Sequence, residues 1–353
     1  MQFQRLHHRA DLVRIAIHAM LERGLEPEFP IEIDRQLATI SGPGRERDTA
    51  IHDLTDLLWC SIDNDDSMDL DQLTASEVLE QGAVRIRVAI ADVDALVQKD
   101  TPIDAHARTN TTSVYTSARI FPMLPEKLST DLTSLNEKED RLAVVTEMVF
   151  NPDGSLAGST VYRALVHNRA KLAYDATSAW LDGRGEMPSA MAAVAGMEEQ
   201  VRTQDAVAQQ LRARRHSEGS LEFETFQPRA VFEGEKVVDI ALQEHNRARQ
   251  LIEELMIATN TCTARFLAGR GGLSLRRVVR SPERWLRIVA VAKDYGDTLP
   301  TEPDSVALGA FLAKRRRIDP LRFPDLSLVI VKLMGAGEYV VEGPRGAAIG
   351  HFG

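Results

Sequence analysis

Apolar residues recur along the chain with two spacings, and these divide it into predicted strands and helices. Continuous or alternating apolar character predicts strands in VRIRVAIADV at 84–93 and in STVYRALVHNRAKL at 159–172. A further β-rich run closes the segment 112–150, after a polar loop that contains prolines. NPDG at 151–154 is typical of a turn between strands, and EGEK at 233–236 predicts the turn of a second hairpin.

Three other segments have helical spacing. Residues 190–217 predict one long helix that ends in the basic RARRH, and residues 245–267 predict the clearest helix of the chain. The apolar face of the latter consists of Leu251, Leu255, Ala258, Cys262 and Phe266. A helix near the N-terminus, stopped by Gly24, is indicated by Leu12, Ile15, Ile17, Met20 and Leu21.

The order of these elements predicts an α+β fold, because strands and helices do not alternate as in a doubly wound sheet. Residues 1–50 are expected to form a small, mainly helical N-terminal region, to which the residues assign no role. SGPGRERD at 41–48 is typical of a linker that separates this region from the rest.

The composition is that of an ordinary folded protein of 353 residues, with 44% hydrophobic and 27% charged residues. No apolar run approaches the roughly 18 residues of a membrane helix. The N-terminal MQFQRLHHRADLV also lacks the apolar core of a secretory signal. Cys60 and Cys262 are the only cysteines, which excludes a disulfide framework and favours a reducing cytoplasm as the location.

The net charge of −10 argues against a protein that merely coats nucleic acid, which is expected to carry a basic excess. An enzyme that holds cations against a phosphodiester needs carboxylates at its site and basic residues only along the path of the strand. The distribution of charge along the chain is therefore more informative about a nucleic-acid partner than the net charge.

An acidic stretch between the first strands is the strongest candidate for chemistry. Like charges this close raise one another's pKa unless cations neutralise them, and oxygen ligands suit hard ions such as Mg²⁺ or Mn²⁺. In an extended segment Asp69 and Asp71 point to the same side. The alternative is a solvated acidic loop. The five aspartates are Asp63, Asp65, Asp66, Asp69 and Asp71.

A calcium-binding loop of the EF-hand type is excluded by position. Such a loop needs Gly at its sixth position and Glu at its twelfth. Counting from Asp63, these positions hold Met68 and Thr74. Counting from Asp65, they hold Leu70 and Ser76.

The acidic segment SIDNDDSMDLDQ resembles the Thr-Ile-Asp…Asp-x-Asp-Asp motif of the ribonuclease II (RNB) family. The long segment from VAIADVDALVQKD to DRLAVVTEM is similar to the family pattern almost throughout. Three later blocks, YRALVHNRAKLAYDA, GSLEFETFQPR and NRARQLIEELMIATNTCTARFL, also resemble the family, in the same order. The similarity covers roughly residues 53–353, and it favours a metal site over a solvated loop.

This resemblance implies a catalytic domain in which a mixed β-sheet, packed by helices, surrounds an RNA channel. It implies hydrolytic 3′→5′ digestion of single-stranded RNA to nucleoside 5′-monophosphates by two metal ions, Mg²⁺ or Mn²⁺. Asp63, Asp69 and Asp71 match the metal-binding carboxylates, and Asp71 matches the most critical one. No membrane and no obligate protein partner are implied.

Gln72 departs from the family, which most often has a fourth Asp there. A neutral amide is a weaker ligand, so one metal would be held less tightly or through water. Asp65 or Asp66 could compensate, although neither matches a ligand position of the family. Asp92, in IADV, is expected either to be structural or to support the ligands from behind.

Aromatic residues inside the similar blocks are candidates for RNA contact, since single strands are commonly held by stacking of bases. Tyr115 and Phe223 match positions that clamp bases in the family, and Tyr174 matches one near the scissile end. The alternative for each is a place in the core. Either Glu253 or Glu254 matches a glutamate that orients the terminal nucleotide, and helix geometry allows only one of them to face inward.

Three basic segments are either part of a phosphate-tracking channel or solvated surface: RARRH at 212–216, RRVVR at 276–280 and KRRR at 314–317. The final IGHFG is followed in the family by a Ser-Pro-x-Arg-Arg stretch and usually an S1 barrel, so the chain is expected to be C-terminally incomplete relative to the family. The N-terminal region is too short for the paired cold-shock barrels found upstream in the family. The entrance to the active site is therefore expected to be more open than is usual in the family.

Two other functions stay open on the sequence alone. One is a catalytically impaired, RNA-binding relative of the same family, in which Gln72 marks lost chemistry. The other is a phosphodiesterase that acts on DNA or small nucleotides, which preference for a ribose 2′-OH would exclude.

Overall fold

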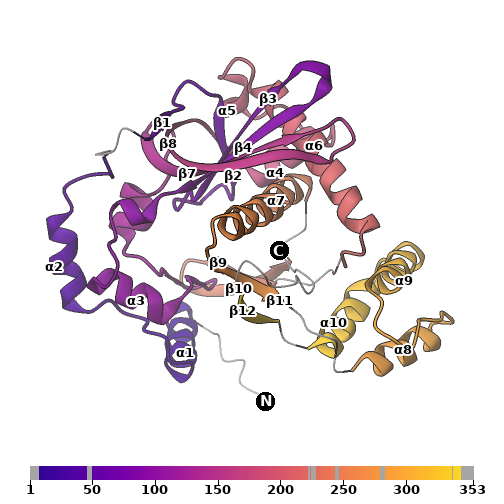
Figure 1. Cartoon of the computed structure of the whole chain (residues 1–353). Coiled ribbons are helices and arrows are strands. Elements are labelled where there is room, and N and C mark those ends of the chain that lie inside the picture. Colours follow the sequence, from indigo (N-terminus) through magenta and orange to yellow (C-terminus); the bar gives the residue numbers. More distant parts are fainter. Residues whose placement is uncertain are drawn as a thin grey trace.

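The computed structural model describes most of the chain (Figure 1). The end of the sequence at 349–353, residues 46–48 of the expected linker and residues 279–280 of one basic segment lie outside the described residues. The described residues are 8–45, 50–221, 223, 228–242, 246–278, 282, 284–335 and 337–342.

A curled β-sheet forms the centre of the fold (Figure 1). Its strand order is β1-β8-β2-β3-β4-β7, and β7 also pairs with β8. The pairings β2–β3–β4–β7–β8–β2 therefore make a closed circuit. The strands are β1 (His52–Asp53), β2 (Trp59–Asp63), β3 (Gln72–Val78), β4 (Val84–Ala91), β7 (Asp140–Phe150) and β8 (Leu156–Ala173).

The circuit closes because β8, at 18 residues, is long enough to pair with two neighbouring strands along different parts of its length. Its residues 156–167 run antiparallel to β7, and residues 168–173 run parallel to β2. The predicted strands at 84–93 and 159–172 are confirmed by β4 and β8. The predicted turn at 151–154 joins β7 to β8, with Gly154 at a φ of 75°.

Helices cover one face of the sheet and share a hydrophobic core with it (Figure 1). They are α4 (Tyr174–Leu181), α5 (Ser189–Ala192), α6 (Met197–Ser217) and α7 (Arg247–Gly269). The predicted helix at 245–267 is confirmed by α7, and Leu251, Leu255 and Cys262 of its expected apolar face are buried. The single helix predicted over 190–217 is wrong: Gly196, at a φ of 82°, separates α5 from α6.

A second core lies on the other side of the strands and includes Trp59, Leu73 and Val145. Both cysteines are buried and free, as expected for a chain without disulfides. Burial raises the pKa of Cys60 to about 11.

The N-terminal region is helical, as predicted, with α1 (Arg9–Glu22) and α2 (Ile31–Thr39). It packs on the larger part of the chain, because Ile33 of α2 is fully buried with Ile103 and Leu128. Ile103 belongs to α3 (Pro102–Asn110), and Leu128 to a π-helical turn (Lys127–Leu132).

A helical lobe lies beside α6 and α7 (Figure 1) and consists of α8 (Trp285–Asp294), α9 (Ser305–Ile318) and α10 (Phe323–Met334). Its own core contains Trp285, Phe311 and Phe323. No helix in the described part of the chain is both long and apolar enough to cross a membrane. Three two-stranded sheets complete the fold: β5 (Val114–Tyr115) with β6 (Ile120–Phe121), β9 (Pro228–Glu233) with β10 (Lys236–Leu242), and β11 (Ser274–Val278) with β12 (Glu338–Glu342).

Candidate active site

The acidic loop, residues 64–71, connects the end of β2 to the start of β3. Leu70 anchors it, since its side chain is buried, its amide donates to Ser134 Oγ at 2.9 Å, and its carbonyl accepts from the amide of Leu135 at 2.8 Å. Lys171 of β8 holds the other half, donating to the carbonyl oxygens of Asp65 at 3.2 Å and Ser67 at 2.6 Å. The sheet and this lysine therefore fix the path of the loop.

Three of the five aspartates act on one another electrostatically. Burial raises the pKa of Asp71 to about 6, and the negative charges of Asp63 and Asp69 add to the rise. Burial also raises the pKa of Asp63, while hydrogen bonds from Asn64 and Ser67 and the charge of Arg249 oppose the rise. The loop thus brings together Asp63, Asp69 and Asp71, the three aspartates expected to bind metal.

Asp65 and Asp66 are exposed on the outer part of the loop. Asp71 is exposed as well, although the surrounding protein still raises its pKa. These two facts agree if protein surrounds Asp71 on most sides but leaves it open to solvent on one. A hydrated cation can therefore reach Asp71, which a fully buried carboxylate would not allow.

The donor chemistry suits a hard divalent cation, because carboxylate oxygens held close together repel until a cation neutralises them. A ready-made cage is nevertheless not formed. Among the described residues, no three or more His, Cys, Asp or Glu side chains are already arranged to hold a metal ion. The expectation that the carboxylates converge into such a cage is therefore not met by the chain alone. One of the carboxylates, that of Asp69, accepts a hydrogen bond from Tyr115.

Tyr115 lies at the acidic loop, as expected for a residue near the site. Its hydroxyl donates to Asp69 Oδ2 at 2.5 Å, and the side chain is 62% exposed. Burial of the hydroxyl end and the adjacent Asp69 charge raise the pKa of Tyr115. The alternative of a core aromatic is wrong for Tyr115, because most of its surface faces solvent.

Tyr174 is the first residue of α4, and the guanidinium of Arg249 covers its ring. The guanidinium carbon is 4.3 Å from the ring centroid. Burial and the charge of Asp63 raise the pKa of Tyr174 to about 12. Tyr174 is therefore a neutral hydroxyl close to the first of the three aspartates.

Arg249 is a site residue that the sequence did not reveal. Its Nη2 donates to Asn64 Oδ1 at 2.6 Å, while its guanidinium stacks on Tyr174. It is placed by the first turn of α7, where the side chain of Asn246 accepts a hydrogen bond from the Arg249 amide. One signal could have identified it, because Arg249 stands four residues before Glu253 and so shares its helix face.

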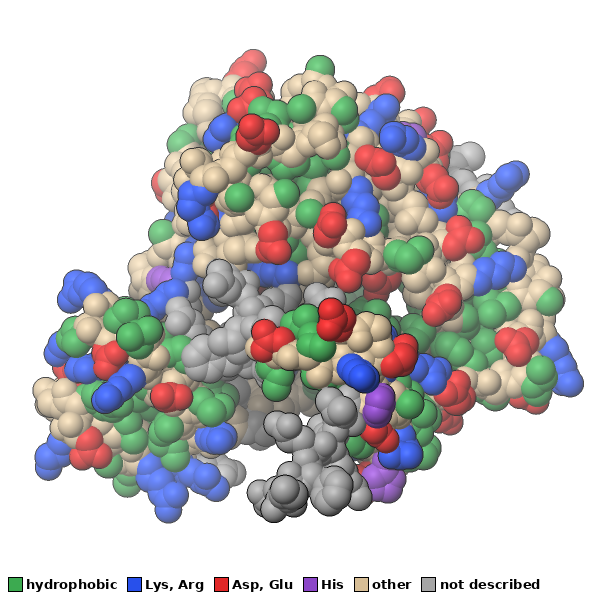
Figure 2. Space-filling view, turned by 180° about the vertical axis from the view of Figure 1, so that it is seen from behind, with side chains coloured by type: hydrophobic (Ala, Val, Ile, Leu, Met, Phe, Trp, Pro, Cys, Tyr) green, Lys and Arg blue, Asp and Glu red, His purple; other side chains and the backbone are tan. Residues whose placement is uncertain are grey.

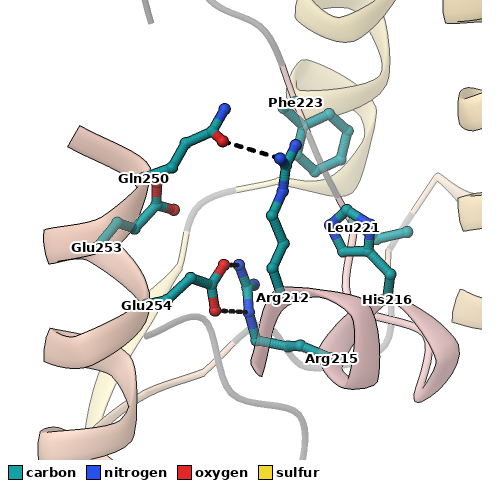
Figure 3. Close-up of a pocket in the computed structure, with 8 residues that line it drawn as sticks. All are labelled: Arg212, Arg215, His216, Leu221, Phe223, Gln250, Glu253 and Glu254. Carbon is teal, nitrogen blue, oxygen red and sulfur yellow. Dashed lines mark hydrogen bonds and ion pairs between the residues drawn. The ribbon is translucent and has the colours of Figure 1, made fainter. Parts of the chain in front are cut away.

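A pocket lies between α6 and α7, and residues that follow Arg249 in α7 line it (Figure 3). Glu254 is buried there in a bidentate pair with Arg215 of α6, at 2.6 and 3.1 Å. Arg212 donates to Gln250 Oε1 at 2.8 Å. Glu253 is exposed and also lines the pocket. The other lining residues are His216, Leu221 and Phe223.

Phe223 lines the same pocket but is half-buried, since it packs against the core of the α8–α10 lobe. The alternative of a core aromatic therefore holds for part of the ring, and contact with RNA stays a prediction. One side of the ring belongs to the lobe, and the pocket reaches the ring as well (Figure 3).

Asp92 and Gln72 belong to the sheet that supports the loop. Asp92 is buried and accepts from Arg163 Nε at 2.6 Å, and the amide of the preceding Ala91 donates to the Asp71 carbonyl at 3.0 Å. Gln72 is buried at the start of β3, opposite Ile90 of β4. Both residues thus lie directly behind the acidic loop.

The basic segments are distributed over three places. Arg212, Arg215 and His216 line the pocket, whereas Arg277 lies 6.0 Å from the Tyr339 ring on β11–β12. The third segment ends α9, and Figure 2 shows Lys and Arg side chains gathered around that lobe, at the left of the view. Only the first segment adjoins the pocket.

Comparison with known proteins gives consistent matches. Residues 51–353 match the RNB domain family. Ribonuclease R of Escherichia coli is 32% identical over 336 residues, which are 92% of this chain and 40% of that protein. Exoribonuclease 2 of Escherichia coli is 31% identical over 280 residues, 77% of this chain and 43% of that protein. The chain therefore spans less than half the length of these relatives.

Solved structures share the fold. The RNase R of Mycoplasma genitalium, in complex with ribose-methylated single-stranded RNA, superposes with a TM-score of 0.82 at 23% identity, covering 93% of this chain and 51% of that one. Yeast Ssd1, described as a pseudonuclease, superposes with a TM-score of 0.65 at 14% identity, covering 85% of this chain and 37% of that one. Since the fold occurs in a pseudonuclease, the fold alone does not establish catalysis.

Proposed function

The chain belongs to the RNB domain family, and from this premise we propose that it hydrolyses single-stranded RNA from the 3′ end and releases nucleoside 5′-monophosphates. The observation that carries the proposal is the grouping of Asp63, at the end of β2, with Asp69 and Asp71 of the acidic loop, where the charges of Asp63 and Asp69 add to the effect of burial in raising the pKa of Asp71. We further propose that the protein acts in the cytoplasm.

The proposal includes a divalent cation, Mg²⁺ or Mn²⁺, held by these three carboxylates. A pair of such ions, when bound, would lower the pKa of the attacking water and stabilise the leaving 3′ oxygen. Neutralising the carboxylates would also remove the repulsion that raises the pKa of Asp71. The site is therefore expected to tighten around the cation.

The surrounding side chains have distinct tasks in this proposal. Tyr115 offers an exposed ring for a base to stack on, while its hydroxyl orients Asp69. Arg249 holds Asn64 and the ring of Tyr174 on one side of Asp63, and its positive charge suits a phosphate there. Glu253 and Phe223 would contact the terminal nucleotide in the pocket beside α7.

RNA is the proposed ligand because two structures of the Mycoplasma protein with this fold contain single-stranded and double-stranded RNA. Recognition of the ribose 2′-OH is what distinguishes such an enzyme from a phosphodiesterase for DNA. A parallel assay on a deoxyribose strand of the same sequence therefore separates the two functions.

The proposal is tested by the substitution Asp71→Asn, which removes one cation ligand and keeps the volume of the side chain. We expect hydrolysis of a labelled single-stranded RNA to be lost while binding of that RNA survives, as measured by fluorescence anisotropy. Asp65→Asn is the matched control, because it removes the same charge from the exposed part of the loop and should leave hydrolysis largely intact.

Hydrolysis by Asp71→Asn at the parent rate would show that the metal assignment is wrong. If the parent itself binds RNA but releases no mononucleotides at any Mg²⁺ concentration, the chain is a binding relative without catalysis. The products of the parent are identified by chromatography.

A further inference from the structure

The small hairpin β5–β6, which carries Tyr115, is held from outside by the N-terminal helical region. We infer that this region acts as a brace that positions Tyr115 against the acidic loop. The inference gives a role to residues for which the sequence indicated none. Its consequence for RNA rests on the proposed function, whereas the positioning of Tyr115 does not.

The hairpin has little to stabilise it from within. Its strands are two residues each, pairing Val114 with Phe121 and Tyr115 with Ile120. Thr116 closes the turn by donating to the Arg119 carbonyl at 2.6 Å. An isolated two-stranded hairpin is marginally stable at best, so contacts with other elements decide where this one lies.

Successive residues of the turn are each bound by a different part of the molecule. Ser117 Oγ accepts from the amide of Ala230 in β9 at 3.0 Å. The carbonyl of Ala118 accepts from Arg9 Nη1 of α1 at 3.2 Å. Arg119 forms a bidentate ion pair with Glu28, between α1 and α2, at 2.8 and 3.1 Å. With the bond from Tyr115 to Asp69, four contacts fix the hairpin.

Arg9 connects the hairpin to β9–β10 as well. Its guanidinium lies 4.4 Å from the Phe232 ring, its Nε is 3.9 Å from Glu235, and its amide donates to the Glu235 carbonyl at 2.9 Å. The start of α1, β9–β10 and the Tyr115 hairpin therefore meet at one arginine.

Contacts with α3 fix the position of the N-terminal helical region. The amide of Glu26 donates to Asn110 Oδ1 at 2.7 Å, and Asn110 Nδ2 donates to the Glu26 carbonyl at 2.8 Å. Phe29 packs on the buried His106, with ring centroids 4.5 Å apart. Glu28 lies between these two fixed residues, so its carboxylate is presented to Arg119 from a defined position.

Surface ion pairs and exposed hydrogen bonds are individually weak, so the test removes both contacts of the N-terminal region together. The brace variant carries Arg9→Ala and Glu28→Gln, and it keeps the bond of Ser117 to β9. The control variant carries Arg14→Ala and Glu22→Gln, whose partners Asp11 and His18 lie within α1. Both proteins are labelled with 3-fluorotyrosine, which gives five ¹⁹F resonances because the chain has five tyrosines. Tyr115→Phe assigns the relevant one.

We expect the Tyr115 resonance to shift or broaden in the brace variant and to stay in place in the control. The dissociation constant for single-stranded RNA should rise about tenfold, the effect of losing one stacked base, with a smaller change in kcat. An unmoved Tyr115 resonance in the brace variant would overturn the inference.

The spectrum requires no activity, so a parent that does not degrade RNA refutes the proposed function and leaves the positioning test valid. A second variant, Arg9→Lys with Glu28→Gln, guards against general unfolding, because lysine can still donate to the Ala118 carbonyl. The Tyr115 resonance should move less in this variant than in the brace variant. Equal movement in both would contradict the brace.

Discussion

Arg249 joins two residues close to Asp63, the first aspartate of the site. It hydrogen-bonds Asn64, which follows Asp63 in the chain, and it stacks on Tyr174, whose hydroxyl is influenced by the charge of Asp63. A planar guanidinium can stack on the ring and donate to Asn64 at once, whereas an ammonium group has donors but no flat face that could stack on the ring. The shape of this side chain therefore matters as well as its charge.

The substitution Arg249→Lys separates these contributions. We expect hydrolysis to fall about tenfold or more, because the stack on Tyr174 and the bond to Asn64 are worth roughly 1–2 kcal/mol together. Single-turnover kinetics on a short RNA measures this change. Arg202→Lys is the control, since Arg202 stacks on Trp180 at 4.2 Å and pairs with Glu198 outside the acidic loop. Equal losses in both variants would mean that stacking supports only the fold.

The aspartates alone left a solvated acidic loop open as the alternative, and the resemblance of SIDNDDSMDLDQ to the family motif is what favoured a metal site there. The choice between Glu253 and Glu254 was not predictable, because it depends on which of them meets Arg215 of α6. Arg249 was missed for the same reason: its partners Asn64 and Tyr174 are far from it in sequence.

At the scale of elements, α6 and α7 are joined by the pair of Glu254 and Arg215. Glu254 is 3% exposed, so its carboxylate depends on this partner. The same contact occupies the carboxylate of Glu254, whereas the neighbouring Glu253 is exposed at the pocket. One ion pair thus links the packing of two helices to the layout of the pocket.

Removing one member of the Glu254–Arg215 pair should lower the free energy of unfolding. Glu254→Ala leaves Arg215 without its buried partner, and we expect a loss of about 2–3 kcal/mol in the free energy of unfolding, at the lower end for buried pairs because Arg215 is partly exposed. Urea unfolding measures it. Glu253→Ala should leave stability nearly unchanged but reduce hydrolysis. If Glu253→Ala proved the more destabilising, the assignment of the two glutamates would be reversed.

The turn between β7 and β8 gives a second test at this scale. Gly154→Ala should cost about 1–2 kcal/mol, since a Cβ is unfavourable at positive φ. The added atom would also lie 3.0 Å from Gln210 Cβ of α6. Gly158→Ala, on β8, meets nothing within 4 Å and should be near neutral. The melting temperatures of the two variants are compared. Equal values would contradict the prediction that a Cβ at position 154 strains the turn.

Local periodicity predicted the strands β4 and β8 and the helix α7, because each has a repeating apolar face. It could not predict the closed circuit of strands, since the pairing of β2 with β8 joins segments that are far apart. Nor did it indicate the break at Gly196, because one glycine inside a helical pattern is compatible with a continuous helix.

At the scale of the whole molecule, the acidic loop is a centre of unfavourable charge that a cation should relieve. A ligand that binds only the folded state stabilises it by about 2.7 kcal/mol at one hundred times its dissociation constant. Mg²⁺ should therefore raise the melting temperature of the parent by several degrees, and a chelator should reverse the rise.

The same melting experiment on two variants locates the effect. Asp71→Asn should melt at the same temperature with and without Mg²⁺, whereas Asp65→Asn should respond like the parent. A response of equal size in Asp71→Asn would place the cation elsewhere on the protein.

The pairing of β2 with β8 also has a consequence for how the protein is made. Cys60 lies opposite Ala170, so β2 leaves the ribosome 110 residues before its parallel partner has been translated. At roughly 5–20 residues per second, that delay lasts about 5–20 s. During this interval β2 can pair only with β3 on one edge, and its other edge, which later pairs with β8, stays open. The fully buried Trp59 and Ile62 of β2 therefore reach their final packing late in synthesis.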